Sequence, residues 1–479
     1  MNPSIDLDMP VSHYSRLTTQ QQNLMKAACL EILERTGVRL YLQEALDILL
    51  KSGAKIEDGN RVRIPAKLVE KAISTAPHSV TIYDRHGEPA MPVMGFRSFF
   101  GPGSDCLHII DHRSWARRDP VLKDVVEGTI LCDYLENIDF LMSLFLPVDV
   151  NRETADRFQM QAMLSHTIKP IVFVTYELSG CMDAVQMAEV VAGGPKDLAN
   201  KPFIACYINP TTGLRHNKEA LQKLLYMADK GLPLFYIPGA MAGTAGPVTV
   251  AGSNVVRLAG SLAGLVIAQL KHEGAPVFIP GWGALALDMR TAVQIYTGPD
   301  HQGVAQAMAH CLDLPMLALG GATDAKLVDQ QAAIEAALTL MFDAVVGSQL
   351  VHDIGYLESG LTGSLAQIVI CDEILTWIKR ALTPVEITPE TLALDLIHET
   401  GPDGQFLDKK HTVRHFREQW HPLLFERYNY EGWIKKGSQT LAERAAQRVD
   451  EILNTHQPEP LPDEVKQRLR AIFENPSRL

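Results

Sequence analysis

Five times between Pro170 and Pro315 the chain repeats one pattern: a proline, then a run of apolar residues rich in Val, Ile, Leu and Phe, then a small or polar turn. Proline lacks the amide donor of a β-ladder and is tolerated at the first residue of a strand, so each proline marks the start of a buried strand. The opposite ends of these strands are thereby located too. The five segments are residues 170–176, 202–209, 233–239, 276–282 and 315–321.

Three further apolar segments complete a set of eight strands. Apolar strands without polar alternation, separated by helices, are typical of a parallel sheet covered on both faces. Eight such strands alternating with helices predict a (β/α)8 TIM barrel, in which the carboxyl ends of the strands carry the function. The additional strands are residues 97–101, 138–146 and 345–352.

The intervening helices follow from apolar periodicity and capping signals. They are residues 120–134, 154–166, 182–192, 217–230, 250–272, 301–311, 327–343 and 366–382.

The predicted fold class is α/β, with the barrel at residues 96–385 and an extension on each side of it. Residues 1–95 form a small N-terminal α+β extension and residues 386–479 a C-terminal helical extension. The first contains predicted helices 18–36, 42–52 and 65–75 with strands 61–64 and 79–84, and the second contains helices 389–399, 411–420, 439–454 and 462–473.

Composition narrows the function classes. With 44 basic and 56 acidic residues the net charge is -12, and no run of Lys or Arg occurs, so nucleic acid and anionic membranes are disfavoured as partners. Residues 1–17 are polar and lack an apolar signal core, and residues 255–270 contain too many small residues for a convincing membrane span, so we expect a cytoplasmic enzyme. The seven cysteines lack zinc-like spacing and are expected to be core side chains.

The predicted mouth of the barrel is rich in aromatic residues and glycines. Aromatic faces attract a quaternary ammonium, and glycines let a large planar group approach the backbone. Aromatic residues that simply fill the barrel interior are an equally good interpretation for any one position. The residues at these strand ends are Phe99, Phe100, Gly101, Tyr176, Tyr207, Asn209, Tyr236, Gly239, Gly281, Trp282, Gly320, Gly321, His352 and Tyr356.

Two strand ends carry polar motifs. The run 320–326 reads Gly-Gly-Ala-Thr-Asp-Ala-Lys, and free amides in such a turn bind an anion, although plain helix capping by Thr323 and Asp324 is the simpler explanation. The run 352–360 begins His-Asp, and a histidine at this place can hold a carboxylate, donate a proton or bind a metal.

These two runs, together with Asp-Gln-Gln-Ala-Ala at 329–333, Arg-Thr-Gly-Val at 35–38 and Ile-Pro-Ala-Lys-Leu-Val at 64–69, resemble the trimethylamine methyltransferase family. The resemblance covers essentially the whole chain. It implies a (β/α)8 protein that passes a methyl group from a methylated amine to the Co(I) centre of a separate corrinoid protein.

Founding members of that family carry pyrrolysine in the barrel, whereas this chain contains only the twenty ordinary residues. Members without pyrrolysine resemble the glycine betaine type, which implies a quaternary amine as methyl donor. A quaternary ammonium already has a neutral tertiary amine as its leaving group, so no proton must be delivered to the departing nitrogen. Glycine betaine, which would release dimethylglycine, is the first choice, ahead of proline betaine, carnitine, γ-butyrobetaine and choline.

The resemblance and the strand ends together give a set of expected roles. Phe99, Tyr207, Tyr236, Trp282 and Tyr356 are expected to surround the ammonium group, and His352, helped by Arg97 or Asn209, to fix a substrate carboxylate. Asp324 and Gln331 are expected to face the cofactor or to order the loop, and the role of Lys326 stays open. The residues expected to approach the corrinoid are Gly281, Gly320, Gly321 and Thr323.

Partners and alternatives complete the expectations. The corrinoid (cobalamin) is expected on a cognate corrinoid protein or supplied free, and no metal is expected to be bound by this chain. The extra helices at both ends favour a homo-oligomer, and the contact with the corrinoid protein is expected to be transient. One alternative is a metal-dependent barrel hydrolase or lyase that uses His352, although no second histidine lies at a predicted strand end. The other is a non-catalytic protein that binds methylated amines with the same aromatic mouth.

Overall fold

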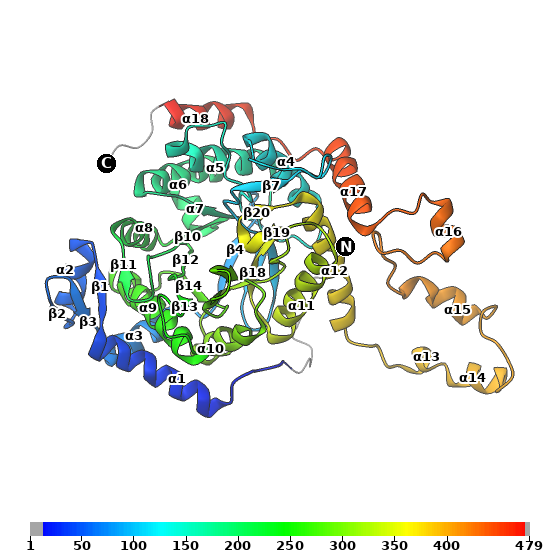
Figure 1. The fold of residues 1–479 in the computed structure, drawn as a ribbon, viewed down its shortest axis with the longest axis horizontal. Coiled ribbons are helices and arrows are strands. Elements are labelled where there is room, and N and C mark those ends of the chain that lie inside the picture. The colour runs from blue at the N-terminus through cyan, green and yellow to red at the C-terminus, as the bar shows by residue number, and fades with distance from the viewer. Residues whose placement is uncertain (1–12, 475–479) are drawn as a thin grey trace.

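Seven parallel strands follow one another in chain order around the centre of the molecule (Figure 1). The structure is a computed structural model that describes residues 13–474. Each of the five proline-marked strands is confirmed and begins one or two residues after its proline. The strands are β6 (Phe99–Pro102), β9 (Ile171–Val174), β10 (Ile204–Ile208), β12 (Leu234–Tyr236), β14 (Val277–Pro280), β17 (Met316–Leu319) and β18 (Leu350–Ile354).

The ring closes through a segment that is not a regular strand. β18 pairs with β6, and residues 138–146 fill the gap between β6 and β9. There the Asp139 amide donates to the Phe100 carbonyl at 2.6 Å, and the Leu141 amide donates to the Pro170 carbonyl at 2.8 Å. The Asp139 side chain accepts from the Phe100 amide at 2.8 Å and so replaces a ladder bond. Residues 138–146 therefore lie where the eighth strand was predicted, but they do not form a regular strand. The fold is an α/β barrel.

Helices surround the strands and match the predicted ones to within a few residues. α9 (Val250–Lys271) is the one helix of the described chain that is long and apolar enough to cross a membrane, and 72% of its most apolar stretch is buried inside the protein. Burial of this kind is typical of a core helix. The surrounding helices are α4 (Leu122–Tyr134), α5 (Ala155–His166), α6 (Leu178–Ala192), α8 (Lys218–Asp229), α9 (Val250–Lys271), α10 (Val304–Leu312), α11 (Gln330–Val346) and α12 (Leu365–Leu382).

The N-terminal extension is joined to the barrel by both strands and helices. Its strand β1 pairs in parallel with β11 (Arg215–His216), and α1 and α3 pack against α9. The elements are α1 (Thr19–Glu31) with a π-helical turn Ile32–Thr36, β1 (Val38–Leu40), α2 (Gln43–Lys51), β2 (Lys55–Glu57), β3 (Arg61–Arg63), α3 (Ala66–Thr75), β4 (Val80–Tyr83) and β5 (Pro89–Val93). Residues 1–12, on which the expectation about a signal segment largely depends, lie outside the described residues.

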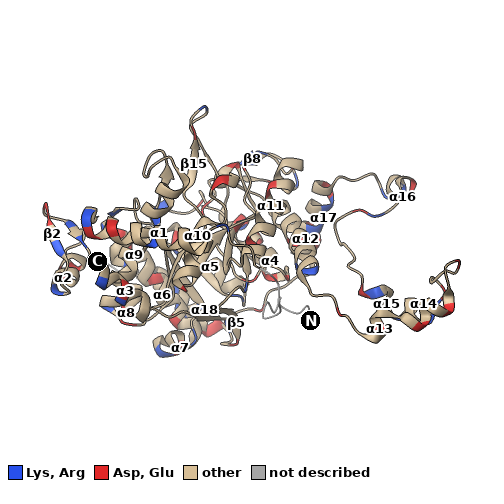
Figure 2. Ribbon diagram, turned by 90° about the horizontal axis from the view of Figure 1, so that it is seen from below, with Lys and Arg blue, Asp and Glu red and all other residues tan. Residues whose placement is uncertain are grey.

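Short strands that the sequence did not predict form two small sheets. One strand of each sheet, β8 and β15, lies on the same side of the barrel in Figure 2. Strands of two to four residues are too short to show a periodicity. One sheet contains β7 (His108–Ile110), β8 (Arg117–Arg118), β19 (Tyr356–Leu357) and β20 (Thr362–Gly363), and the other contains β13 (Met241–Ala242), β15 (Leu285–Asp288) and β16 (Val293–Ile295). Short helical pieces lie at α7 (Pro195–Asn200), Arg152–Thr154, Pro299–His301 and Glu358–Gly360.

The C-terminal extension divides into two parts. α17 (Leu441–Thr455) packs on α12, and α18 (Asp463–Glu474) packs on α6. Residues 383–438, which we call the arm, extend away from the barrel in both views, although the amides of residues 423–425 donate to Glu373 on α12 (Figures 1 and 2). The predicted helix 389–399 is two short helices, and the predicted helix 411–420 ends at His415. The arm contains α13 (Pro389–Leu392), α14 (Leu394–Thr400), α15 (Lys410–His415), a 3-10 turn Phe416–Glu418 and α16 (Tyr430–Lys435).

Candidate active site

A cavity of about 450 Å³ opens at the carboxyl ends of the strands. Five residues with a predicted binding role line it: Tyr207 and Asn209 from β10 and its end, Trp282 after β14, His352 in β18, and Tyr356 in β19. The Tyr356 hydroxyl is fixed by the backbone of Ser104, whose amide donates to it at 2.7 Å. The structure therefore brings this part of the predicted site together.

Three residues predicted at the mouth lie elsewhere. Phe99 is the first residue of β6 and Arg97 precedes it, so both lie towards the amino-terminal end of the barrel. The Tyr236 ring packs on α9, where a Cβ added at Gly264 would come within 2.1 Å of it, and its hydroxyl lies 2.7 Å from His216 Nδ1. The prediction that Phe99, Arg97 and Tyr236 face the substrate is wrong in position.

The residues predicted to approach the corrinoid make contacts inside the protein. The Gly281 amide donates to the Leu317 carbonyl at 2.7 Å, and the Gly320 amide donates to the His352 carbonyl at 3.1 Å. The Gly321 amide donates to Thr339 Oγ1 at 3.0 Å, and the buried Thr323 donates to Glu335 at 2.5 Å. A turn whose amides are already bonded does not offer the free donors that anion binding requires.

Asp324 orders a loop rather than lining the cavity. Its carboxylate accepts from the amides of Tyr296 and Thr297 at 3.0 and 3.2 Å and from the Ser359 hydroxyl at 2.7 Å. It thereby fixes the end of the β15–β16 hairpin, from which Tyr296 reaches the cavity. Of the two roles expected for Asp324, the structure supports loop ordering.

Gln331 and Lys326 lie on the surface. Gln331 is exposed in the first turn of α11 and donates to Glu335 Oε1 at 2.9 Å. Lys326 is exposed and donates to the Asp324 carbonyl at 2.7 Å. Neither lines the cavity, so the expectation that Gln331 faces the cofactor from within the mouth is wrong in position.

The sequence reasoning missed a buried cation, Arg257 on α9. Its Nε donates to the Pro238 carbonyl at 3.1 Å, and its Nη1 donates to the carbonyls of Trp282 and Gly283 at 2.7 and 2.9 Å. The guanidinium lies 4.1 Å above the Trp282 ring. Burial lowers the pKa of Arg257 to about 10, so it stays charged at neutral pH.

No acidic side chain among residues 13–474 forms an ion pair with Arg257, although the side chain lines the cavity. A buried cation without an anion is costly unless a partner arrives. The signal available in the sequence was a lone arginine in the apolar run of α9, since charged residues are almost never buried without a partner.

A buried acid, Asp353, was also missed as a site residue. It lies at the end of β18 in a left-handed backbone conformation with a φ of 79°, which is uncommon for a residue other than glycine. Burial raises the pKa of Asp353 to about 8. Because strain of this kind collects at functional sites, the conformation itself marks the position.

Three tyrosines surround the acid. Burial, and then the charge of Asp353, raise the pKa of Tyr207, Tyr296 and Tyr356. Tyr207 and Tyr296 also interact electrostatically with Arg257. Tyr207 and Tyr296 are therefore close enough to both Asp353 and Arg257 to be influenced by each, and Tyr356 is close to Asp353.

His352 is neutral at physiological pH. Burial, and less strongly the charge of Arg257, lower the pKa of His352 to about 4. Its Nδ1 lies 2.7 Å from the Ala318 carbonyl and is therefore the protonated nitrogen, which leaves Nε2 as an acceptor. That nitrogen lies 3.6 Å from Asp353 Oδ1, so His352 already faces an acid of this chain and carries no charge for a substrate carboxylate.

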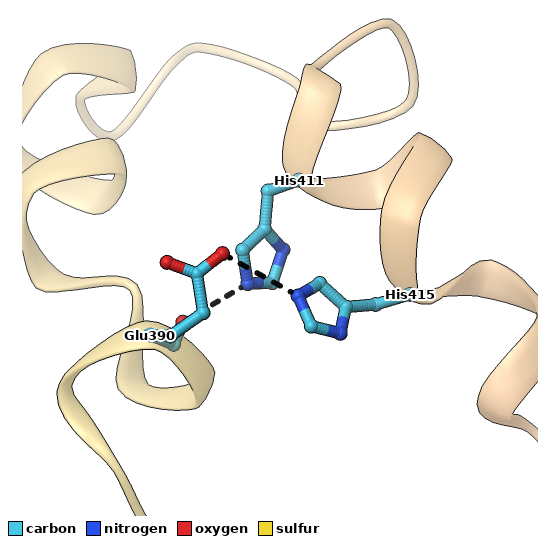
Figure 3. Close-up of side chains that lie close together, drawn as sticks. All are labelled: Glu390, His411 and His415. Atoms are coloured by element: carbon cyan, nitrogen blue, oxygen red, sulfur yellow. Dashed lines mark hydrogen bonds and ion pairs between the residues drawn. The ribbon is translucent and has the colours of Figure 1, made fainter.

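One group of potential metal ligands occurs in the described chain, and it lies in the arm (Figure 3). It consists of Glu390, His411 and His415, with the Glu390 carboxylate 3.6 Å from His415 Nε2. Arg414 also contacts that carboxylate at 3.1 Å, so Glu390 already forms an ion pair with a side chain of this protein. We interpret this group as an ion-pair cluster that fastens α13 to α15.

Comparison with known proteins finds matches that extend over nearly the whole chain. A family model described as trimethylamine methyltransferase matches residues 4–476. Trimethylamine methyltransferase MttB of Desulfitobacterium hafniense (strain DSM 10664 / DCB-2) is 31% identical over 450 residues, which cover 93% of this chain and 90% of that protein. A glycine betaine methyltransferase of Desulfitobacterium hafniense (strain Y51) is 28% identical over 466 residues, with 96% of each chain covered.

A solved structure resembles the fold. The monomethylamine methyltransferase of Methanosarcina barkeri matches with a TM-score of 0.50 at 12% identity and covers 91% of this chain and 89% of that one. At this identity the likeness supports the barrel architecture alone.

Proposed function

Since the chain belongs to the trimethylamine methyltransferase family and is therefore a methyltransferase, we propose that its methyl donor is a quaternary amine bearing a carboxylate, glycine betaine first. The acceptor is the Co(I) corrinoid of a partner protein, and the released product is dimethylglycine. The observation that carries the choice of donor is Arg257, a buried cation that lines the cavity and forms no ion pair with an acid in the part of the chain that the structure describes.

The carboxylate end of the donor is assigned to Arg257. Its Nε and Nη1 are held by backbone carbonyls, and its plane lies on Trp282, so the guanidinium has a fixed direction. These bonds occupy the hydrogens of Nε and Nη1, so the two N–H groups of Nη2 are the donors left for a carboxylate, and a preorganised guanidinium loses little entropy on binding. This assignment replaces the one made for His352.

The ammonium end is assigned to the tyrosines near Asp353. Tyr207, Tyr296 and Tyr356 line the cavity, and each desolvated ring face turned to a cation contributes about 0.5 to 2 kcal/mol to its binding. Trp282 is less suited, because Arg257 already lies over its ring. Asp353 adds an opposite charge to the site when it is ionised.

Methyl transfer then needs alignment more than acid catalysis. The C–N bond breaks with its electron pair remaining on nitrogen, and the methyl carbon forms a bond to cobalt, which supplies the other pair. The leaving amine is neutral, so no residue must protonate it. This chain holds the methyl carbon in line at the mouth and limits access of water, since fixed geometry can contribute about 7 kcal/mol or more.

The alternatives fit the cavity less well. A metal-dependent hydrolase needs about three protein ligands, whereas the described cavity residues offer His352 and Asp353. A protein that only binds methylated amines would use the same cavity and is distinguished by turnover.

Turnover with purified protein tests the proposal. Free Co(I) cobalamin is mixed with the chain and glycine betaine, methylation is followed by the absorbance change, and dimethylglycine is measured. Choline serves as the matched donor without a carboxylate, and trimethylamine as the tertiary amine. We expect glycine betaine to be preferred over both. Binding of glycine betaine without product, or an equal rate with choline, would contradict the proposal.

A further inference from the structure

The arm carries an unusual number of exposed apolar side chains. Thirteen large apolar residues of residues 383–438 are exposed, and Leu424 is the only large apolar residue of this segment that is buried. Its helices have four to seven residues, too short to be stable alone in water. The most exposed side chains include Val385 at 80%, Leu407 at 79% and Leu423 at 83%. A segment of this kind requires a surface to cover it.

Charge divides the arm into two legs of opposite sign. Residues 383–408, the acidic leg, contain six acidic residues and no Lys or Arg. Residues 409–438, the basic leg, contain seven Lys or Arg and three acidic residues. Figure 2 shows acidic positions on α14 and basic positions on α15.

Most of these charges have no ion pair in the described part of the chain. Glu390 is the acidic-leg residue that does, and it contacts Arg414 and His415. A groove of about 530 Å³, lined by α13, α14 and α15, stays open between the legs. Pairing within one arm therefore leaves both the charge and the apolar surface largely unmatched.

We propose that the arm is an association element that pairs with the arm of a second copy of this chain, acidic leg against basic leg. A two-fold axis brings the same surface of both copies together, so a surface with one acidic and one basic half matches itself. The apolar side chains supply the affinity, and the charges supply the orientation.

The place of the arm distinguishes a second copy from a corrinoid protein. The arm leaves the barrel after α12, which begins near the carboxyl end of β18 and returns to the opposite end of the barrel. The methyl donor cavity lies at the carboxyl ends of the strands. A corrinoid protein that receives the methyl group must contact the cavity, whereas a second copy has no such requirement.

Charge reversal of one leg at a time tests the proposal with the full-length protein. Variant A carries Asp395→Lys and Glu399→Lys, and variant B carries Lys410→Glu and Lys435→Glu. All four side chains are exposed, and none has an ion pair among residues 13–474. The control carries Glu70→Lys and Glu464→Lys, two exposed acids outside the arm. Molar mass is measured by sedimentation equilibrium at low and high salt.

We expect the wild type and the control to associate, with weaker association at high salt, and each of A and B alone to associate at least ten times more weakly. An equimolar mixture of A and B should form the mixed species, because both leg contacts are complementary in it. A monomeric wild type, association of A or B equal to that of the wild type, or no mixed species would each overturn the proposal. Circular dichroism on each variant shows that the loss is not unfolding.

Discussion

Each end of the barrel has a cation that is held by three backbone carbonyls, but among residues 13–474 carboxyl groups act on only one of the two. At the amino-terminal end, Lys169 Nζ donates to the carbonyls of Cys132, Leu135 and Ile138 at 2.8, 2.6 and 2.6 Å. At the mouth, Arg257 donates to three carbonyls in the same way.

The charges around the two cations differ. Burial lowers the pKa of Lys169, and Asp139, Asp133 and Asp372 act against that shift. The groups that act on Arg257 in this sense are two tyrosines, Tyr207 and Tyr296. Among residues 13–474, the cation of the amino-terminal end thus has acidic neighbours, whereas Arg257 at the mouth has no acidic group in an ion pair with it, which is the difference expected between a structural and a ligand-binding end.

Removing the cation of the amino-terminal end should have the largest effect, and it should be on stability. Lys169→Met leaves buried carboxyls and three carbonyls without their cation, which costs on the order of 3–5 kcal/mol. Denaturant unfolding measures the loss. Lys230→Met, which removes an ion pair with Glu189 near the surface, is the control and should cost below about 1 kcal/mol. The KM of the folded Lys169 variant should be unchanged, and a change in KM with unaltered stability would reverse the comparison.

Removing the cation of the mouth should act on substrate instead. Arg257→Gln should raise the KM for glycine betaine roughly 10- to 100-fold, because a hydrogen bond to a charged group contributes about 1.5–3 kcal/mol. The KM for choline, which has no carboxylate, should barely change. Steady-state kinetics with both donors measures this. An equal rise for both donors would mean that Arg257 only shapes the cavity.

Removing an aromatic face should have a smaller effect that does not distinguish the donors. Tyr296→Leu is expected to raise the KM roughly 2- to 30-fold for glycine betaine and choline alike, as cation–π contacts contribute about 0.5–2 kcal/mol. Tyr236→Leu is the matched control, since that ring packs on α9 away from the cavity. If only Tyr236→Leu affected the KM, the assignment of the ammonium end would be wrong.

A change of pH should have the smallest effect. Burial raises the pKa of Asp353 to about 8, so the carboxyl ionises as pH rises through 8 and then attracts the ammonium group. The KM of any quaternary amine should fall over that range, and Asp353→Asn should flatten the profile.

The same ionisation has the opposite sign for stability. The pKa of the folded state lies above the unfolded value near 3.9, so the contribution of Asp353 to stability declines from about pH 4 to pH 8. Burial also raises the pKa of Asp343 to about 7, which adds to the decline.

The test of the pH prediction is the KM of the wild type. A KM that does not change with pH would contradict the assignment of Asp353 to the ammonium end.

The sequence located the site residues that lie on proline-marked strands. It did not show which face of the strand each side chain occupies. Tyr207 and Tyr236 illustrate this. β10 and β12 pair Tyr207 with Phe235 and Ile208 with Tyr236. Successive side chains alternate between the two faces of a strand, so Tyr207 points into the cavity while Tyr236 points to α9. The prediction assigned both tyrosines to the mouth, which is right for Tyr207 and places Tyr236 on the wrong face of its strand.

What the sequence determined by itself is the order and direction of the barrel strands, because prolines and apolar runs are local signals. It also placed five residues at the same end of the barrel, Tyr207, Asn209, Trp282, His352 and Tyr356. Only the tertiary structure decided that Arg257 from the middle of a helix, Tyr296 from a hairpin and Asp353 from a strained strand end meet in one cavity. Their meeting depends on contacts between residues far apart in the chain, which leave no local pattern, and it turned an aromatic mouth into a site with a basic end and an acidic end.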